Sequence, residues 1–191
     1  RRYVANPHAS GRFSETAKRA LATAEADLLA AIGIPPEQAR VIWTGGGTEA
    51  ANLGTLGVLR RSHGALALLD AGAHPALGEP CRQYARREGG RCVEVPLLPD
   101  GHLDYERVDP GLVRQAALVA LTHVNNETGA VSDLDAARAW LNRHGSEAVL
   151  TVDAAQSLGK HGIPWQTAGI DALASGRPLG VLVQRYLENA Y

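Results

Sequence analysis

The chain has 191 residues, of which 45% are hydrophobic and 20% charged, so it is long and apolar enough for a packed domain and is neither disordered nor collagen-like. Its 19 basic and 20 acidic side chains leave a formal charge of −1, which gives no electrostatic reason to expect nucleic acid or an anionic membrane as a partner. No apolar run approaches the roughly 20 residues that span a bilayer. We therefore expect a soluble protein.

The numbers of cysteines, lysines and methionines bear on the cellular compartment of the protein and on whether the sequence is complete. Cys81 and Cys92 form neither a redox pair nor a zinc pattern, and two thiols suit a reducing cytoplasm better than a disulfide framework. Methionine is absent, and Lys18 and Lys160 are the only lysines. We expect a cytoplasmic protein, and a sequence that is a piece of a longer one.

The first predicted element is a long amphipathic helix from Ser14 to Ile32, with Ser14 as its N-cap and Gly33 as its stop. Its apolar stripe is Ala17, Leu21, Ala24, Leu28 and Ala31. Short apolar runs then alternate with helix-length segments, which predicts one α/β domain with a mostly parallel sheet flanked by helices. The predicted strands are 40–44, 65–70, 91–95, 117–124, 148–153, 171–174 and 180–184, and the predicted helices between them are 48–61, 76–88, 105–115 and 133–144.

Ligands of open α/β sheets bind beyond the carboxyl ends of the strands, and four such ends here carry unusual residues. At the first, Gly45, Gly46 and Gly47 lead into a helix whose free N–H groups and positive dipole end suit an anion such as phosphate. A P-loop lysine is missing, so cleavage of a nucleoside triphosphate is not expected. A glycine-rich turn without a ligand is the alternative.

The other three strand ends carry hydrogen-bonding or titratable side chains. His74 lies in a loop just before a helix, where a surface histidine or a cap is the alternative. Residues 122–129 are dense in polar side chains, and a turn built from asparagines would explain them as well. Asp153 ends a hydrophobic strand with Gln156 three residues on, and a half-buried carboxylate is costly unless it is paired with a cation. A capping aspartate is the alternative there.

Two functional interpretations use these residues differently. Gly45, Gly47 and Ala50 fit a dinucleotide-binding fingerprint, and Asp70 follows where a ribose-binding acid belongs. That interpretation leaves Asp153 and the 123–127 segment without a role. A pyridoxal-phosphate pocket employs all four strand ends: phosphate at the glycine turn, a carboxylate on the ring nitrogen, amides on the ring hydroxyl and a histidine over the ring.

The motifs carry a family resemblance from about residue 5 to about residue 185. NPHAS at 6–10, GGTEAANL at 46–53, HPA at 74–76, HVNNETG at 123–129 and VDAAQSLGK at 152–160 follow the order and spacing of cysteine desulfurases. The chain thus resembles a class V enzyme of the fold-type I pyridoxal-phosphate group. The resemblance implies the large-domain fold of that group, pyridoxal 5'-phosphate as cofactor, and no metal.

The resemblance also implies a role for each matching residue. In the family an alanine usually stands at the position of Gly47, and a backbone donor tolerates that difference. The implied site consists of Gly47, Thr48 and Ser175 at the phosphate, His74 on the ring as a catalytic proton shuttle, Asp153 at the ring nitrogen, and Asn126 and Gln156 at the ring hydroxyl.

One motif of the family is broken. Its members continue with Ser-Gly-His-Lys, whose lysine forms the Schiff base, whereas here Ser175-Gly176 is followed by Arg177. Lys160 already occupies the lysine of its own motif, and the nucleophilic cysteine and the small domain of the family have no counterpart. We therefore expect residues 1–191 to be a cofactor-binding large-domain core without the anchoring-lysine loop and the C-terminal small domain.

The implied function is conversion of L-cysteine to L-alanine, with the sulfur passed as a persulfide to an acceptor protein that serves sulfur-containing cofactors or nucleic-acid modification. The resemblance also implies a homodimer. A catalytically inactive or truncated relative that binds a partner is one alternative. A dinucleotide-binding protein using Gly45, Gly47 and Asp70 is the other.

Overall fold

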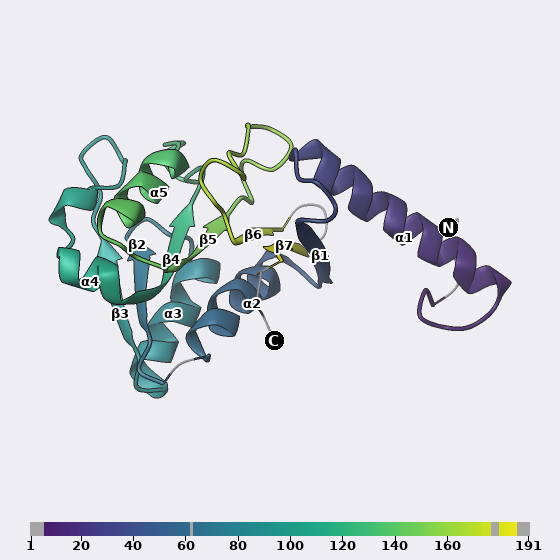
Figure 1. The fold of residues 1–191 in the computed structure, drawn as a ribbon, viewed down its shortest axis with the longest axis horizontal. Helices are drawn as coiled ribbons and strands as arrows, with labels where there is room; N and C mark the ends of the chain where they lie inside the picture. The colour runs from purple at the N-terminus through teal and green to yellow at the C-terminus, as the bar shows by residue number, and fades with distance from the viewer. Residues whose placement is uncertain (1–5, 62, 177–179, 187–191) are drawn as a thin grey trace.

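The computed structural model describes residues 6–61, 63–176 and 180–186, which form a seven-stranded sheet with helices on both faces (Figure 1). The strands are β1 Ala39–Thr44, β2 Leu66–Asp70, β3 Arg91–Val95, β4 Ala116–Thr122, β5 Val149–Asp153, β6 Ala172–Ser175 and β7 Gly180–Arg185. The helices are α1 Arg12–Ala31, α2 Gly47–Leu59, α3 Pro75–Arg87, α4 Pro110–Gln115 and α5 Leu134–Arg143, with a 3₁₀ turn at Tyr105–Arg107.

The strand order places the predicted site at one edge of the sheet. The order is β1-β7-β6-β5-β4-β2-β3, and β7 alone among these strands runs in the direction opposite to the others. The carboxyl ends of β1, β2, β4, β5 and β6 therefore meet at the same edge, where open α/β sheets bind their ligands. The predicted mostly parallel α/β sheet is confirmed.

Alternate residues of the strands face two different hydrophobic layers. In β2, Leu66 and Leu68 join the layer under α5, whereas Ala67 and Leu69 join the layer under α2 and α3. The second layer contains many alanines, so α2 approaches the sheet closely enough for the Thr151 hydroxyl to donate to the Gly54 carbonyl at 3.0 Å. This close packing fixes the beginning of α2 at the edge of the sheet.

The first helix differs from the prediction at its start and in its buried face. The helix begins at Arg12, and its N-cap residue is Gly11. Ser14 is buried in the first turn and makes no capping hydrogen bond, so the predicted cap is wrong. The predicted stop at Gly33 is confirmed, with φ of 68° there. Ala24 and Ala31 of the predicted stripe are exposed because α1 extends away from the sheet (Figure 1). Across the described residues, no helix combines the length and the apolar character needed to cross a membrane.

The predicted helix over residues 105–115 is wrong as one element. The chain forms the 3₁₀ turn, then leaves helical geometry at Val108 and restarts as α4. Asp109 caps α4 by accepting the N–H groups of Gly111 at 2.7 Å and Leu112 at 3.2 Å. Pro110 has no N–H and would clash inside a continuous helix, so it is suited only to the first helical position. The predicted strand over 117–124 likewise ends early, at Thr122.

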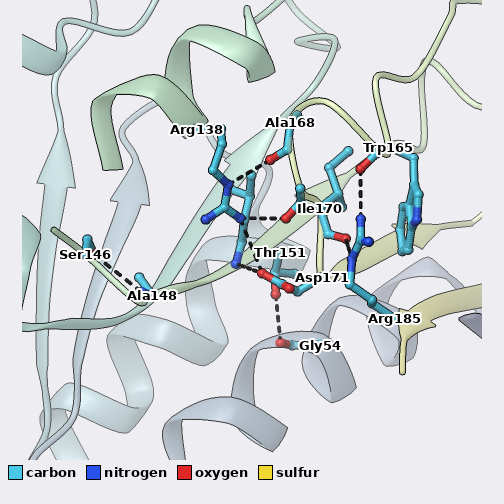
Figure 2. A network of polar contacts seen from close by, with 12 residues as sticks. Gly54, Arg138, Ser146, Ala148, Thr151, Trp165, Ala168, Ile170, Asp171 and Arg185 are labelled. Atoms are coloured by element: carbon cyan, nitrogen blue, oxygen red, sulfur yellow. Dashed lines mark hydrogen bonds and ion pairs between the residues drawn. The ribbon is translucent and has the colours of Figure 1, made fainter. Parts of the chain in front are cut away.

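A polar network fastens α5 to the segment that leads into β6 (Figure 2). The guanidinium of Arg138 donates to the carbonyls of Ala168 at 2.9 Å and Gly169 at 2.5 Å, and it pairs with Asp171 at 3.5 Å. Asp171 also accepts the Leu150 N–H at 2.8 Å. Burial raises the pKa of Asp171, and the Leu150 N–H and the guanidinium lower it in part. These donors therefore offset part of the cost of burying the carboxylate.

We predict that Arg138→Met lowers the free energy of unfolding by about 2–4 kcal/mol, because it leaves two carbonyls without their donor and removes a cationic partner from a partly buried carboxylate. The matched control is Arg143→Met on the same helix. Arg143 pairs with Glu106 at 3.0 Å, but the two side chains are 60% and 79% exposed, so its loss should cost less than about 1 kcal/mol. Urea denaturation of both variants measures the difference, and equal losses would contradict the role given to Arg138.

Candidate functional site

A cavity of about 320 Å³ opens at the carboxyl edge of the sheet. Its volume lies at the lower end of the range for small-molecule sites. Six of the seven site residues expected from the sequence line it, and Ser175 does not. The lining residues are Gly47, Thr48, His74, Ala76, Thr122, Val124, Asn126, Asp153, Ala155, Gln156 and Gly176.

One end of the cavity is the N-terminus of α2. Gly46 occupies the N-cap position without a side-chain cap, and the first helical bond runs from the Ala50 N–H to the Gly46 carbonyl at 3.1 Å. The N–H groups of Gly47 and Thr48 consequently have no partner within the described part of the chain. Uncapped N–H groups at the positive end of a helix dipole form an anion site.

Asp153 lies on another wall of the cavity, at the end of β5. Its Oδ1 accepts the Ala155 N–H at 2.9 Å, and its other oxygen receives no hydrogen bond from the residues that the structure describes. Burial raises the pKa of this carboxyl group, while the Ala155 N–H and the electrostatic influence of His74 lower it in part. The ionised group thus lacks full compensation, and a cationic ligand atom would supply it.

His74 is held in one orientation by its own helix. It is the N-cap of α3, and its Nδ1 accepts the Ala76 N–H at 3.1 Å. An accepting Nδ1 carries no proton, so we assign the neutral ring with its hydrogen on Nε2. His74 lines the same cavity as Asp153 and lies within its electrostatic reach.

The two asparagines of the 123–129 motif have different roles. Asn125 builds the turn: its Oδ1 accepts the N–H groups of Glu127 at 2.9 Å and Thr128 at 3.0 Å. Asn126 instead lines the cavity. The turn interpretation is therefore right for Asn125, whereas the role expected for Asn126 stays a prediction that its position in the cavity wall allows.

Gln156 is the second amide that lines the cavity. Its Oε1 accepts from Lys160 Nζ at 3.5 Å, four residues further along the chain. Lys18, on the outlying helix α1, is exposed.

Ser175 and Asp70 were assigned to ligand binding from the sequence, but neither side chain is exposed to the cavity. Ser175 is only 2% exposed at the end of β6, and Gly176 forms the cavity wall instead. Asp70 is 3% exposed, and backbone N–H groups occupy both of its carboxylate oxygens, so it does not present a carboxylate to a ribose. That finding removes the acid on which the dinucleotide interpretation depends.

The sequence analysis missed the cavity residues that carry no polar signature. Ala76, Val124 and Ala155 are apolar members of the quoted motifs, and only the fold shows that they line the cavity. Thr122 begins the polar run 122–129 noted in the sequence, but it was given no role of its own; it ends β4 directly beside Asp153 of β5. Its hydroxyl is buried without a hydrogen-bond partner among the described residues.

The two cysteines are not reactive thiolates. Cys81 is fully buried in α3, and burial raises the pKa of its thiol to about 12. Burial also raises the pKa of the half-buried Cys92. Within the described ranges, no group of three or more histidine, cysteine or acidic side chains is placed to hold a metal ion.

A pocket that offers an anion site at one end and a carboxylate in need of a cation at another suits pyridoxal phosphate, whose phosphate and protonated ring nitrogen carry those charges. The fold agrees with this class, that of the fold-type I pyridoxal-phosphate enzymes. A cysteine desulfurase from Thermococcus onnurineus NA1, solved in its apo form, is 24% identical with a TM-score of 0.82, over 98% of this chain and 48% of its own. SspA, solved in complex with cysteine, is 23% identical with a TM-score of 0.82, over 98% of this chain and 55% of its own.

Residues 1–177 match the family model "Aminotransferase class-V", and the chain belongs to that family. Class V aminotransferases use pyridoxal 5'-phosphate. The cysteine desulfurase IscS of Proteus mirabilis is 31% identical over 167 residues, which are 86% of this chain and 40% of that protein. The chain thus spans about 40% of the length of the curated relatives it matches.

We predict that Gly47→Ala lowers the free energy of unfolding by about 1–3 kcal/mol, because its Cβ would lie 2.9 Å from the Cα of Gly176 and backbone would have to move. Gly46→Ala is the matched control. A Cβ at Gly46 meets nothing within 4 Å, so the change should stay below about 1 kcal/mol. Thermal denaturation compares the two, and a fully stable Gly47→Ala protein would contradict the close approach.

A second prediction concerns the ligand-free chain and pH. The raised pKa of Asp153 means that the folded state binds its proton more tightly than the unfolded state, so this group's contribution to stability falls as pH rises above the ordinary value of 3.8. Asp153→Asn removes the titration while keeping an oxygen for the Ala155 N–H. We expect this variant to melt at a higher temperature than the wild type near neutral pH, with the difference shrinking towards acid. Melting curves across that range measure it, and a difference that grows in acid would refute the stated cause.

Proposed function

We propose that residues 1–191 form the cofactor-binding large-domain core of a pyridoxal-phosphate-dependent cysteine desulfurase. The observation that carries the proposal is the placement of Asp153 in one cavity with His74 and the uncapped N-terminus of α2. Family membership and the cysteine desulfurase relatives support it.

The lining residues divide between the two ends of the cofactor. The N–H groups of Gly47 and Thr48 would bind the phosphate, and Asp153 would bind the ring nitrogen and keep it protonated. When bound, the cofactor supplies a positively charged ring that withdraws electrons from the amino acid's Cα. The amides of Asn126 and Gln156 would orient the ring through its hydroxyl.

Ser175 enters this proposal as a contact near the phosphate. It precedes Gly176, whose backbone lies against Gly47 where the phosphate would bind. Arg177, at which the sequence departs from the family's His-Lys, lies outside the described residues. We therefore propose that Ser175 lies behind Gly176 and closes the cavity at its phosphate end.

His74 is the proposed catalytic residue. Its Nδ1 is engaged by the Ala76 N–H, so Nε2 is the atom available to hold or move a proton. Lying over the ring face, the imidazole would also exclude water from that side. His74 and Asp153 line the same cavity, which supports this placement.

Two groups that the reaction needs must come from elsewhere. The chain's lysines are Lys18, on α1, and Lys160, whose Nζ lies 3.5 Å from Gln156 Oε1. Cys81 and Cys92 are too buried and too weakly acidic to serve as the sulfur-accepting thiolate. We infer that the anchoring lysine, the thiolate and the small domain belong to a longer protein of which this chain is a part.

Substrate, partners and location complete the proposal. The substrate is L-cysteine and the product L-alanine, in line with the names of the relatives and with SspA, which was solved with cysteine. The sulfur would pass as a persulfide to an acceptor protein, and the working enzyme would be a homodimer. Two free thiols among the described residues suit the cytoplasm as its location.

We predict that the purified chain binds pyridoxal phosphate and that Asp153→Ala weakens this binding by about 10- to 100-fold, since a charge-assisted hydrogen bond is lost. Asp109→Ala is the matched control. Asp109 accepts an N–H two residues on, as Asp153 does, but it caps α4 and does not line the cavity. Titration followed by the cofactor's visible absorbance measures both. A chain stabilised by NAD and not by pyridoxal phosphate would overturn the proposal.

The break after Gly176 favours one alternative, a truncated or non-catalytic relative that retains the pocket. Measuring the intact mass of the protein isolated from its own organism distinguishes this relative from the complete enzyme. A mass near 20.2 kDa, together with cofactor binding but no alanine formed from cysteine, would establish the non-catalytic relative.

A further inference from the structure

Asp70 is a buried carboxylate to which the proposed function gives no task. It ends β2, and its Oδ1 accepts the Gly72 N–H at 2.7 Å while its Oδ2 accepts the Thr122 N–H at 3.1 Å. Burial raises the pKa of Asp70, and these two N–H groups lower it in part. The Thr122 hydroxyl also lowers the pKa of Asp70. The hydroxyl is not within hydrogen-bond geometry of the carboxylate or of another described residue.

The two N–H groups belong to segments that carry different parts of the cavity. Gly72 lies in the turn that leads, two residues later, to His74. Thr122 lines the cavity at the end of β4, directly beside Asp153 in the sheet. One carboxylate therefore ties the histidine turn to the strand end that adjoins Asp153.

The Gly72 peptide is also held from its other side. Asn125 Nδ2 donates to the Gly72 carbonyl at 3.1 Å. A Cβ on Gly72 would lie 3.1 Å from that Nδ2 and 3.4 Å from Asp70 Oδ1, so the glycine fits closely between the two side chains. Because Asn125 also builds the turn that carries Asn126, the clamp formed by Asp70, Gly72 and Asn125 joins three cavity-forming segments.

We propose that Asp70 is a positioning residue of the cavity, which sets the place and tautomer of His74 beside Asp153 by holding Gly72 against the end of β4. The effect on the cofactor rests on the proposed function, whereas the effect on His74 exists in the ligand-free chain. Asparagine at this position keeps one acceptor oxygen and turns an NH₂ group towards the other N–H. It can therefore satisfy only one of the two segments.

Asp70→Asn tests the clamp, and Asp171→Asn is its control. Asp171 is a partly buried carboxylate that also accepts a backbone N–H, but it directly precedes β6 and does not line the cavity. The readouts are the ring ¹⁵N chemical shifts of His74 in the ligand-free chain and the Kd for pyridoxal phosphate. We expect Asp70→Asn to shift His74 away from the single Nε2–H form and to raise the Kd about tenfold. We expect Asp171→Asn to lower the melting temperature and to leave both readouts unchanged.

Unchanged His74 shifts and Kd in a folded Asp70→Asn protein would overturn the proposal, and so would equal changes in the control. If Asp70→Asn does not fold, Asn125→Ala releases the same glycine from its other side. In that variant, altered His74 shifts support the clamp and unaltered shifts refute it. A wild-type chain that binds no pyridoxal phosphate would defeat the proposed function alone, because the His74 shifts are measured without cofactor.

Discussion

The electrostatic cost of holding Asp153 at the end of a hydrophobic strand is the constraint on which the site depends. The surrounding protein gives this carboxylate one N–H donor and no full cationic partner among the described residues, and burial raises its pKa. An ionised carboxylate in that condition destabilises the ligand-free fold, and a cationic ligand atom would offset that cost. Loss of stability and gain of binding thus have the same physical origin, as is common at functional sites.

The position of α2 supplies the other end of the pocket, and small residues make it possible. The alanines of the layer under α2 and α3, together with Gly54, let α2 approach the sheet closely. At this distance the Thr151 hydroxyl donates to the Gly54 carbonyl of the helix. At the helix start, Gly47 meets the backbone of Gly176 at a distance that excludes a side chain. The free N–H groups are therefore placed by packing, and no side chain is needed to present them.

Two aspartates, at the ends of β2 and β5 on either side of β4, show how local bonding decides a residue's role. Both Asp70 and Asp153 follow apolar strands, and sequence reasoning gave each a ligand. Both oxygens of Asp70 accept backbone N–H groups, whereas Asp153 accepts one. Asp70 consequently joins segments of the protein, and Asp153 retains an oxygen for a ligand. The same contrast separates Asn125, which builds a turn, from Asn126, which lines the cavity.

The sequence by itself determined the alternation of strands and helices, the location of the site at the carboxyl edge, and six of its lining residues. These follow from periodicity, from motif spacing and from the rule that parallel strands share one carboxyl edge. Only the tertiary structure decided that β7 runs antiparallel, that Ala24 and Ala31 of the predicted α1 stripe are exposed, and that Asp70 is buried. Each of these depends on contacts between residues far apart in the chain, such as the 3.1 Å bond between Asp70 and Thr122, and such contacts leave no periodic signal in the sequence.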